Sequence, residues 1–217
     1  MADSRGRAPR RRLLRFPELC PACRRSSDAG FCDSCAAAFR TLRDPCTVCA
    51  LPGRRDRCER HDSSWRIGRT WAVYEYAEPL AHYLQALKFS HGRALGRAFG
   101  LLVAAALRRE RERGELDVDA LVPVPLSPQR LRERGYNQAV EIARALAAEL
   151  DLPLALGGVS RPVGGRAQSR LNARDRKANV AHAFRVGRGC DGRRLAIVDD
   201  VITTGATVNA LAAALEA

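Results

Sequence analysis

The sequence contains no long apolar segment. No run of apolar residues approaches the roughly 18 that a membrane-spanning helix needs, and the N-terminal residues include no apolar core of a secretory signal peptide. These absences predict a protein without a membrane span that resides in the cytoplasm. In that compartment, paired cysteines are better suited to metal ions than to disulfides.

Lysine is nearly absent, although the chain is strongly basic. The formal net charge of the 217 residues is +13, and only two of the 37 basic residues, Lys88 and Lys177, are lysine. Such a bias reflects genomic base composition as much as function. The charge would attract phosphates or nucleic acid, but it does not choose between them.

Residues 1–15 are Arg-rich and have no apolar periodicity. Disorder is the default for such a composition. A basic arm that binds nucleic acid is the alternative, because arginine neutralises backbone phosphates.

Seven cysteines and one histidine form two sets with metal-ligand spacing. The first set is CxxC–x8–CxxC and the second is CxxC–x8–CxxH, made up of Cys20, Cys23, Cys32 and Cys35, and of Cys46, Cys49, Cys58 and His61. Each CxxC can direct two sulfur atoms at one ion, so each set predicts a tetrahedral structural zinc site. Disulfides are the alternative. Because a histidine replaces the last cysteine of the second set, the sequence predicts one zinc ion or two.

A cysteine-rich module of this size has almost no core of its own. Bound metal would therefore supply much of its folding energy. The module could contact nucleic acid, dock a protein or cover a catalytic domain. The eighth cysteine, Cys190, has no partner nearby in the sequence.

The stretch LAIVDDVITTGAT, from Leu195 to Thr207, combines a strand with polar groups. Its four apolar residues predict a strand buried on both faces of a parallel sheet. Asp199 and Asp200 follow at the carboxyl end, where open α/β sheets bind ligands, and two carboxylates suit the hydroxyls of a sugar. The Thr/Gly segment and the helix after it offer N–H and hydroxyl groups to an anion. The stretch predicts a phosphate beside a ribose.

A second buried strand is predicted from residue 119, and the prolines at 123 and 125 end it in a loop. Ser127-Pro128 predicts a helix start, with Arg130 and Arg134 on one face. These features suit an anion, although a basic surface turn is the alternative. Further helices are predicted over about 79–89, 94–113 and 138–150, and an alternating strand over 70–76.

Three stretches together resemble a known family. LAIVDDVITTGAT resembles the signature with which type I phosphoribosyltransferases bind 5-phosphoribosyl-1-pyrophosphate (PRPP) with Mg²⁺. LVPVPLSPQRLRERGYNQA and QSRLNARDRKANVAHAF, with the Cys-rich N-terminus, are similar to the ComF branch of competence and amidophosphoribosyltransferase-like proteins. The resemblance extends from about Cys20 to the end. It implies an α/β fold, with a Rossmann-like parallel-sheet phosphoribosyltransferase domain preceded by a small Cys-rich zinc module.

The resemblance also implies roles for individual residues. Asp199 and Asp200 would be the catalytic pair that holds the ribose hydroxyls. The 5′-phosphate would bind to Thr203, Thr204, Gly205, Ala206 and Thr207. The pyrophosphate would bind to Leu126, Ser127, Arg130, Arg134 and Asn137. A flexible loop would contribute Gln168, Arg174 and Asn179, and Lys88 is a candidate contact for a phosphate.

Three parts of the chain are predicted on this basis. They are a basic tail over 1–15, a double zinc-ribbon-like module over 16–64 and the phosphoribosyltransferase domain over 65–217. Only ten residues follow Thr207, whereas the fold normally adds at least one more strand, so we expect either a truncated domain or an unusually short C-terminus. No residue stands out as a nucleophile or obligatory base, so catalysis would rest on positioning and charge neutralisation.

The predicted function is that of a PRPP-binding, ComF-type protein that transfers or binds a phosphoribosyl group, linked to DNA uptake or nucleotide salvage. The alternative is a non-catalytic accessory protein of DNA uptake that binds single-stranded DNA through its zinc module and arginines. The Arg-rich stretch around 168–184 fits a closing loop, a nucleic-acid path or a disordered linker. A purely structural adaptor is the third hypothesis.

Overall fold

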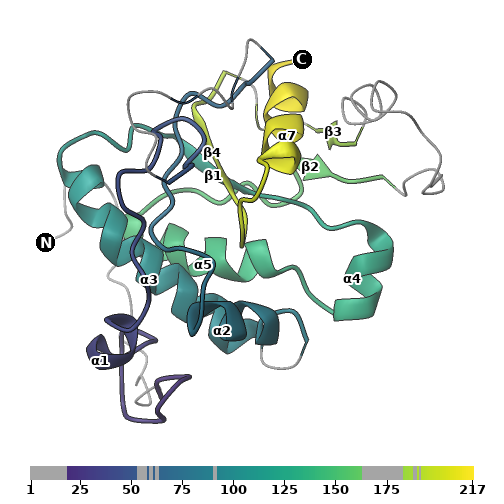
Figure 1. Ribbon diagram of the computed structural model, residues 1–217. Helices are drawn as coiled ribbons and strands as arrows, with labels where there is room; N and C mark the ends of the chain where they lie inside the picture. The colour runs from purple at the N-terminus through teal and green to yellow at the C-terminus, as the bar shows by residue number, and fades with distance from the viewer. Residues whose placement is uncertain are drawn as a thin grey trace, which may run out of the picture.

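The computed structural model describes residues 19–52, 58, 61, 64–89, 92–162, 183–187, 190 and 192–217. Three helices come first in this part, and strands and further helices follow (Figure 1). The elements are α1 (Asp33–Ala36), α2 (Leu80–Ala86), α3 (Gly92–Glu112), β1 (Ala120–Pro123), α4 (Pro128–Arg134), α5 (Gln138–Leu150), β2 (Val159–Ser160), β3 (Arg185–Val186), β4 (Leu195–Val198) and α7 (Ala206–Glu216).

The central sheet is parallel. β1 pairs with β4 from Ala120 opposite Leu195 to Pro123 opposite Val198, and a parallel bridge joins Leu121 to Leu154 on the other edge of β1. A second, antiparallel pair is formed by β2 and β3. The parallel pairing was predicted from the two apolar runs, and it aligns the carboxyl ends of β1 and β4 at one edge of the sheet.

Helices cover both faces of this sheet (Figure 1). Leu121 and Val198 pack into a core with α3 and α5, whereas Val122 packs with Val208 and Leu211 of α7. Alternate residues of a strand face opposite sides, so the apolar runs bury side chains in both directions. The described part is therefore a mixed α/β structure with helices on either face of a parallel strand pair.

Two glycines bring α3 and α5 into close contact. A Cβ on Gly96 would lie 2.5 Å from the Cβ of Glu141, and one on Gly100 would lie 2.5 Å from the carbonyl oxygen of Ile142. Because the two glycines are four residues apart, they lie on the same face of α3. This contact sets the distance between the two helices that support the sheet.

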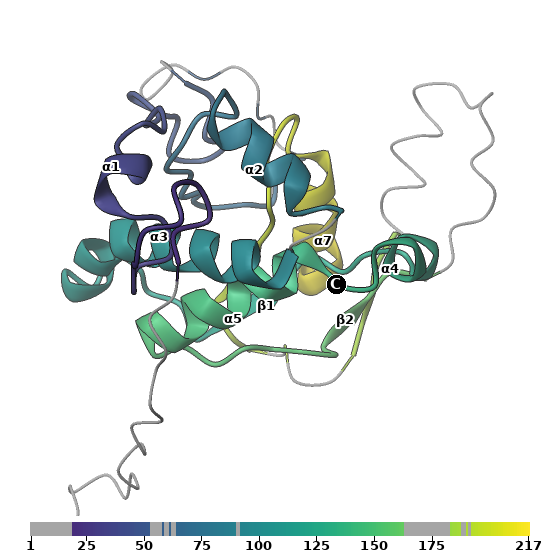
Figure 2. The same ribbon diagram turned by 90° about the horizontal axis from the view of Figure 1, so that it is seen from below.

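The cysteine-rich segment shares the main core rather than forming its own. Cys20, Phe31 and Phe39 are buried in the same cluster as Leu95, Phe99 and Leu146 of the α3–α5 pair. The ring centroid of Phe31 lies 5.0 Å from that of Phe39 and 5.3 Å from that of Phe99. Figure 2 shows α1 beside α3 accordingly.

Two of our expectations about strands are wrong. Residues 70–76 form no strand, because among the residues that the structure describes they pair only at the bridge between Thr41 and Tyr74. Leu195, Ala196 and Ile197 of β4 are half-buried, and only Val198 is buried. β4 pairs with β1 alone among the described strands, and a cavity of about 1000 Å³ runs along it from Leu195 to Ile202.

None of the helices in the described ranges is long and apolar enough to span a bilayer. The longest, α3, has a mixed composition that includes several arginines.

Candidate functional site

The paired carboxylates lie where β4 ends. Asp199 Oδ1 accepts a hydrogen bond from the backbone N–H of Asp200 (2.9 Å), and Asp200 Oδ1 accepts one from the N–H of Val201 (3.1 Å). Each bond occupies one oxygen of its carboxylate, and the other oxygen of Asp200 lies 3.5 Å from the ammonium of Lys88. Both residues are half-buried, so a ligand at the edge of the sheet can reach them.

The loop between the carboxylates and α7 has the features of an anion site. Gly205 precedes α7 at φ +74°, a left-handed conformation that glycine adopts without steric cost, and no side chain caps the helix. Thr203, Thr204 and Thr207 are exposed around it, and Thr204 Oγ1 accepts a long hydrogen bond from the N–H of Ala206 (3.4 Å). Free N–H groups, hydroxyls and the helix dipole therefore converge here.

The loop after β1 approaches the same edge. Ser127 caps α4 by accepting a hydrogen bond from the N–H of Arg130 (3.3 Å), with Pro128 at the first helical position. Asn137 caps α5 through the N–H of Ala139 (3.0 Å) and donates to the carbonyl of Val124 (2.9 Å). Val124 in turn donates from its N–H to the carbonyl of Val198 (2.9 Å). Both helix starts predicted from the sequence are confirmed, and Asn137 fastens the loop to the sheet.

Cationic side chains surround the two carboxylates. Lys88 Nζ lies 3.5 Å from Asp200 Oδ2, and both side chains are mostly buried. Leu87, the residue before Lys88, accepts a hydrogen bond through its carbonyl from the hydroxyl of Tyr136. Arg161 lies near enough to Asp199 and Arg130 for their charges to act on it. Burial and Arg130 lower the pKa of Arg161, and Asp199 raises it in compensation.

Asp199 holds its proton unusually tightly. Burial, followed by the charge of Asp200, raises the pKa of Asp199 to about 7 from an ordinary value of 3.8, although Lys88 acts in the opposite direction. Raised pKa values of this kind gather at functional sites, because crowded like charges are favourable only when a ligand compensates them. Hydroxyl donors or a divalent cation would both supply that compensation.

Replacing Asp199 with asparagine is expected to stabilise the ligand-free protein above pH 7. The pKa of Asp199 is higher in the native protein than in the unfolded chain. The free energy of unfolding that this group contributes is therefore complete below about pH 4 and is lost as the pH rises through 7. We expect the melting temperature of Asp199→Asn to exceed that of the wild type by roughly 5 °C at pH 8, and by less at pH 5. Thermal unfolding followed by circular dichroism tests this. The exposed Asp117→Asn is the control, and an equal difference at both pH values would contradict the assignment.

The ligand atoms of each cysteine set lie close together, as the spacing predicts. The ligand atoms of Cys20, Cys23, Cys32 and Cys35 lie within 4.8 Å of one another, as do those of Cys46, Cys49, Cys58 and His61. Sγ of Cys23 is 3.5 Å from that of Cys32, and Cys46 Sγ is 3.4 Å from His61 Nε2. Both arrangements fit a tetrahedral zinc ion with S₄ or S₃N ligands.

The protonation of these thiols also favours a cation. The hydrogen bond with Cys32, together with burial, raises the pKa of Cys35 to about 12, whereas backbone hydrogen bonds outweigh burial and lower that of Cys46 to about 6. Without metal, thiols and thiolates must share protons within each cluster. A divalent cation would allow all the ligands to deprotonate.

Several predicted residues lie outside the described ranges. Gln168, Arg174 and Asn179 of the expected flexible loop belong to them, as does the basic tail over 1–15. All the other predicted ligand residues are described, and Asp199, Asp200, Lys88 and the two helix starts lie near the same edge of the sheet.

Two residues near the site were missed by sequence reasoning. Arg161 was given no role at the site, but it follows β2 and its guanidinium lies over the ring of Phe184, close enough to Asp199 for that charge to act on it. Trp65, which was given no role, packs on Gly205. Nothing in their local sequence indicates these contacts, because both depend on pairing between distant segments.

The fold and these groups define a mixed α/β protein with two adjacent carboxylates beside the start of α7 and two clusters that could bind zinc. DNA utilization protein YhgH of Escherichia coli strain K12 is 34% identical to it over 209 residues, which cover 92% of this chain and 91% of that protein. Competence protein F of Haemophilus influenzae is 31% identical over 196 residues (88% and 81%). Competence protein ComFC of Streptococcus pneumoniae is 24% identical over 197 residues (88% and 84%).

These relatives match most of both chains, so the chain belongs to the ComF family. No protein-family model matches it, and no solved structure does.

Proposed function

We propose that the protein binds PRPP with Mg²⁺ at the carboxyl ends of β1 and β4, as a phosphoribosyltransferase or as a binding protein of that fold. The observation that carries the proposal is the pair of carboxylates, Asp199 and Asp200, beside the uncapped start of α7. A ribose diol donates to carboxylates, and a phosphate accepts from N–H groups and hydroxyls. The two groups are joined in a ribose 5-phosphate.

The roles of the remaining residues follow from their positions. Thr203, Thr204, Gly205, Ala206 and Thr207 would hold the 5′-phosphate. Leu126, Ser127, Arg130, Arg134 and Asn137 would bind the pyrophosphate at the start of α4, and Arg161 would add a charge there. Lys88 would exchange its partner Asp200 for a phosphate oxygen, or keep Asp200 oriented. Mg²⁺ would neutralise part of the charge of the leaving pyrophosphate.

We extend the proposal to the whole chain. Residues 65–217 would constitute a Rossmann-like phosphoribosyltransferase domain, with the zinc-bearing module over 16–64 packed on it. The names of the relatives concern DNA utilization and competence, which supports a role in DNA uptake for this protein as well.

The direct test is calorimetric titration of Mg²⁺·PRPP into the zinc-loaded wild-type protein. Saturable binding that requires Mg²⁺ is expected, and pyrophosphate release in the presence of candidate acceptors would then distinguish a transferase from a binding protein. Absence of binding by the folded protein would contradict the proposal.

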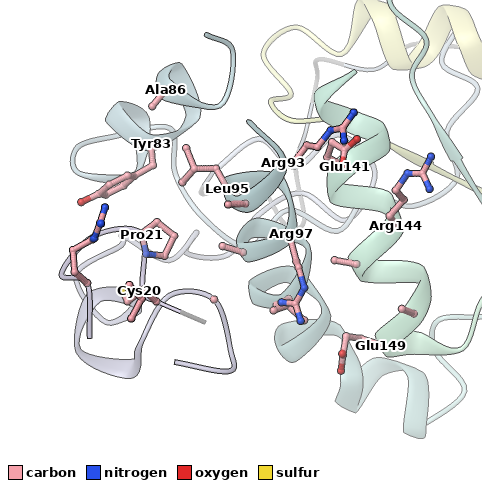
Figure 3. A pocket seen from close by; sticks show the side chains of 18 of the residues that line it. Cys20, Pro21, Tyr83, Ala86, Arg93, Leu95, Arg97, Glu141, Arg144 and Glu149 are labelled. Atoms are coloured by element: carbon pink, nitrogen blue, oxygen red, sulfur yellow. The ribbon is translucent and has the colours of Figure 1, made fainter. Parts of the chain in front are cut away.

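An arginine groove supports the second candidate function, binding of single-stranded DNA. A cavity of about 930 Å³ lies between the first cysteine set, α2, α3 and α5. Figure 3 shows Arg93 and Arg97 on α3 and Arg144 on α5, with Tyr83 on the opposite wall. The groove contains two acidic residues, Glu141 and Glu149, and Glu149 is paired with Arg108 at 3.3 Å. Arginines beside an aromatic ring suit phosphates joined to stacked bases.

Exchanging three groove arginines for glutamine, in Arg93→Gln/Arg97→Gln/Arg144→Gln, is expected to weaken DNA binding at least about tenfold. Each lost phosphate contact should reduce the slope of log affinity against log salt by about 0.7. Fluorescence anisotropy with labelled dT20 at several salt concentrations measures both. The control has the same charge and carries Arg109→Gln/Arg113→Gln/Arg193→Gln, all exposed outside the groove. Equal losses in both variants would show binding without a defined site.

A further inference from the structure

Residues 203–207, which we propose to hold the phosphate and name the phosphate loop, are packed against a tryptophan from a distant part of the chain. A Cβ on Gly205 would lie 2.3 Å from the Cη2 atom of Trp65 and 3.0 Å from its Cζ3. The indole ring therefore lies directly on the backbone of Gly205, which is itself buried. Since Gly205 is left-handed and α7 has no side-chain cap, the conformation of the loop depends on what packs against it.

Asn209 fixes the backbone on both sides of this tryptophan. Its Oδ1 accepts a hydrogen bond from the N–H of Arg66 (2.6 Å), and its Nδ2 donates to the carbonyl of Ser64 (3.1 Å). Asn209 belongs to the first turn of α7, where its own N–H donates to the carbonyl of Gly205 (2.9 Å). Residues 64–66 and the start of α7 thus form one hydrogen-bonded unit.

The same segment is tied to the second cysteine–histidine cluster. The N–H of Thr70 donates to the carbonyl of Thr47 (2.7 Å), and its hydroxyl donates to the carbonyl of Val48 (2.6 Å). Both acceptors lie between the cluster residues Cys46 and Cys49. The ring of His61, the fourth member of the cluster, lies 6.3 Å from that of Trp65. Residues 64–70, which we name the strap, therefore join the second cluster to the phosphate loop.

We propose that metal binding at the second cluster positions the phosphate loop through the strap, with Trp65 as the positioning residue. A bound zinc ion would fix the backbone around Cys46, Cys49 and His61 and so hold both anchors of the strap. Loss of that ion would free the strap at Thr70, where it is bonded to residues 47 and 48. It would also free His61, whose ring lies beside that of Trp65. The ring would then constrain Gly205 less, and the N–H groups at the start of α7 would diverge. The second cluster becomes a regulator of the anion site rather than a structural accessory alone.

Amide hydrogen exchange tests the coupling without any ligand. Cys58→Ser removes one ligand of the second cluster and leaves the strap intact. We expect exchange of the peptide over 203–207 to accelerate about tenfold in this variant and in Trp65→Ala, but no further when the two are combined, since both act through one contact. Zinc analysis confirms that Trp65→Ala retains its metal, and unchanged exchange in α5 confirms the fold.

Unchanged exchange over 203–207 in Cys58→Ser, with one zinc ion lost, would overturn the proposal. Additive effects in the double variant would also overturn it, because they would show two independent routes. Trp65→Phe retains a ring at Gly205 and is expected to restore most of the wild-type protection. Trp71→Phe is the matched control, since Trp71 lies outside the strap and its replacement should leave the loop unaffected.

A second measurement uses PRPP as the ligand and therefore rests on the proposed function. Titration of Mg²⁺·PRPP is expected to give about tenfold weaker binding for Trp65→Ala than for the wild type, with near-normal binding for Trp65→Phe. If the wild type does not bind PRPP, the proposed function is contradicted. Hydrogen exchange still tests whether the second cluster positions the loop. Equal affinity of wild type and Trp65→Ala would overturn the positioning role.

Discussion

The Asp199→Asn/Asp200→Asn variant is expected to lose at least about 100-fold in affinity for Mg²⁺·PRPP at pH 8. Each carboxylate would accept a charge-assisted hydrogen bond from a ribose hydroxyl, and the loss of two such bonds costs about 3–6 kcal/mol. At pH 8 Asp199 is largely ionised, because its pKa is about 7. Calorimetric titration of both proteins measures the difference.

Asparagine retains the shape of the side chain and an acceptor oxygen for the turn formed with Val201. A fold defect is therefore not expected, and the matched control is Asp117→Asn, whose carboxylate pairs with Arg194 away from the anion site. Affinity within twofold of the wild type in the double variant would show that the carboxylates do not hold the ligand. Loss of affinity in Asp117→Asn as well would indicate a general charge effect.

Removing a ligand of the first cysteine cluster is expected to have the largest effect on stability. Cys20 is 0% exposed and Phe31 is 1% exposed, within the core that also contains α3 and α5. In Cys20→Ser the cluster should lose its zinc ion, and the loss of the metal should lower the free energy of unfolding by roughly several kcal/mol. We expect the melting temperature to fall by more than about 10 °C.

Thermal unfolding and zinc determination by elemental analysis test this together. The control is Cys190→Ser, which changes another buried cysteine that belongs to neither cluster. It should retain two zinc ions per chain and lose much less stability. A Cys20→Ser protein with two zinc ions, or with an unchanged melting temperature, would contradict the assignment.

Features encoded in consecutive residues were predictable from the sequence. The CxxC spacing predicted both clusters, and Ser127-Pro128 predicted the start of α4. The apolar runs before Asp199 and Pro125 predicted a parallel strand pair with its polar end at the site. In each case the interacting groups either lie within a few residues or follow from the geometry of a parallel sheet.

Contacts between distant segments were not predictable. Arg66 and Asn209, which hold the strap, are 143 residues apart, and no pattern in either segment indicates the other. Residues 70–76 alternate like a strand, but a strand needs a partner along its whole length, and within the described residues the only bridge of this segment is at Tyr74. The position of Arg161 depends in the same way on how β2 pairs with β3.

The shared core of the cysteine segment bears on the order in which the chain is assembled. Cys20, Phe31 and Phe39 leave the ribosome before α3 and α5 have been synthesised, although those helices supply the apolar surface that covers them. Of the four thiols, only that of Cys20 is buried, whereas those of Cys23, Cys32 and Cys35 are half-exposed. The first cluster can therefore bind an ion either before or after α3 and α5 pack against it. The core around Cys20 and Phe31, in contrast, closes only when those two helices are in place.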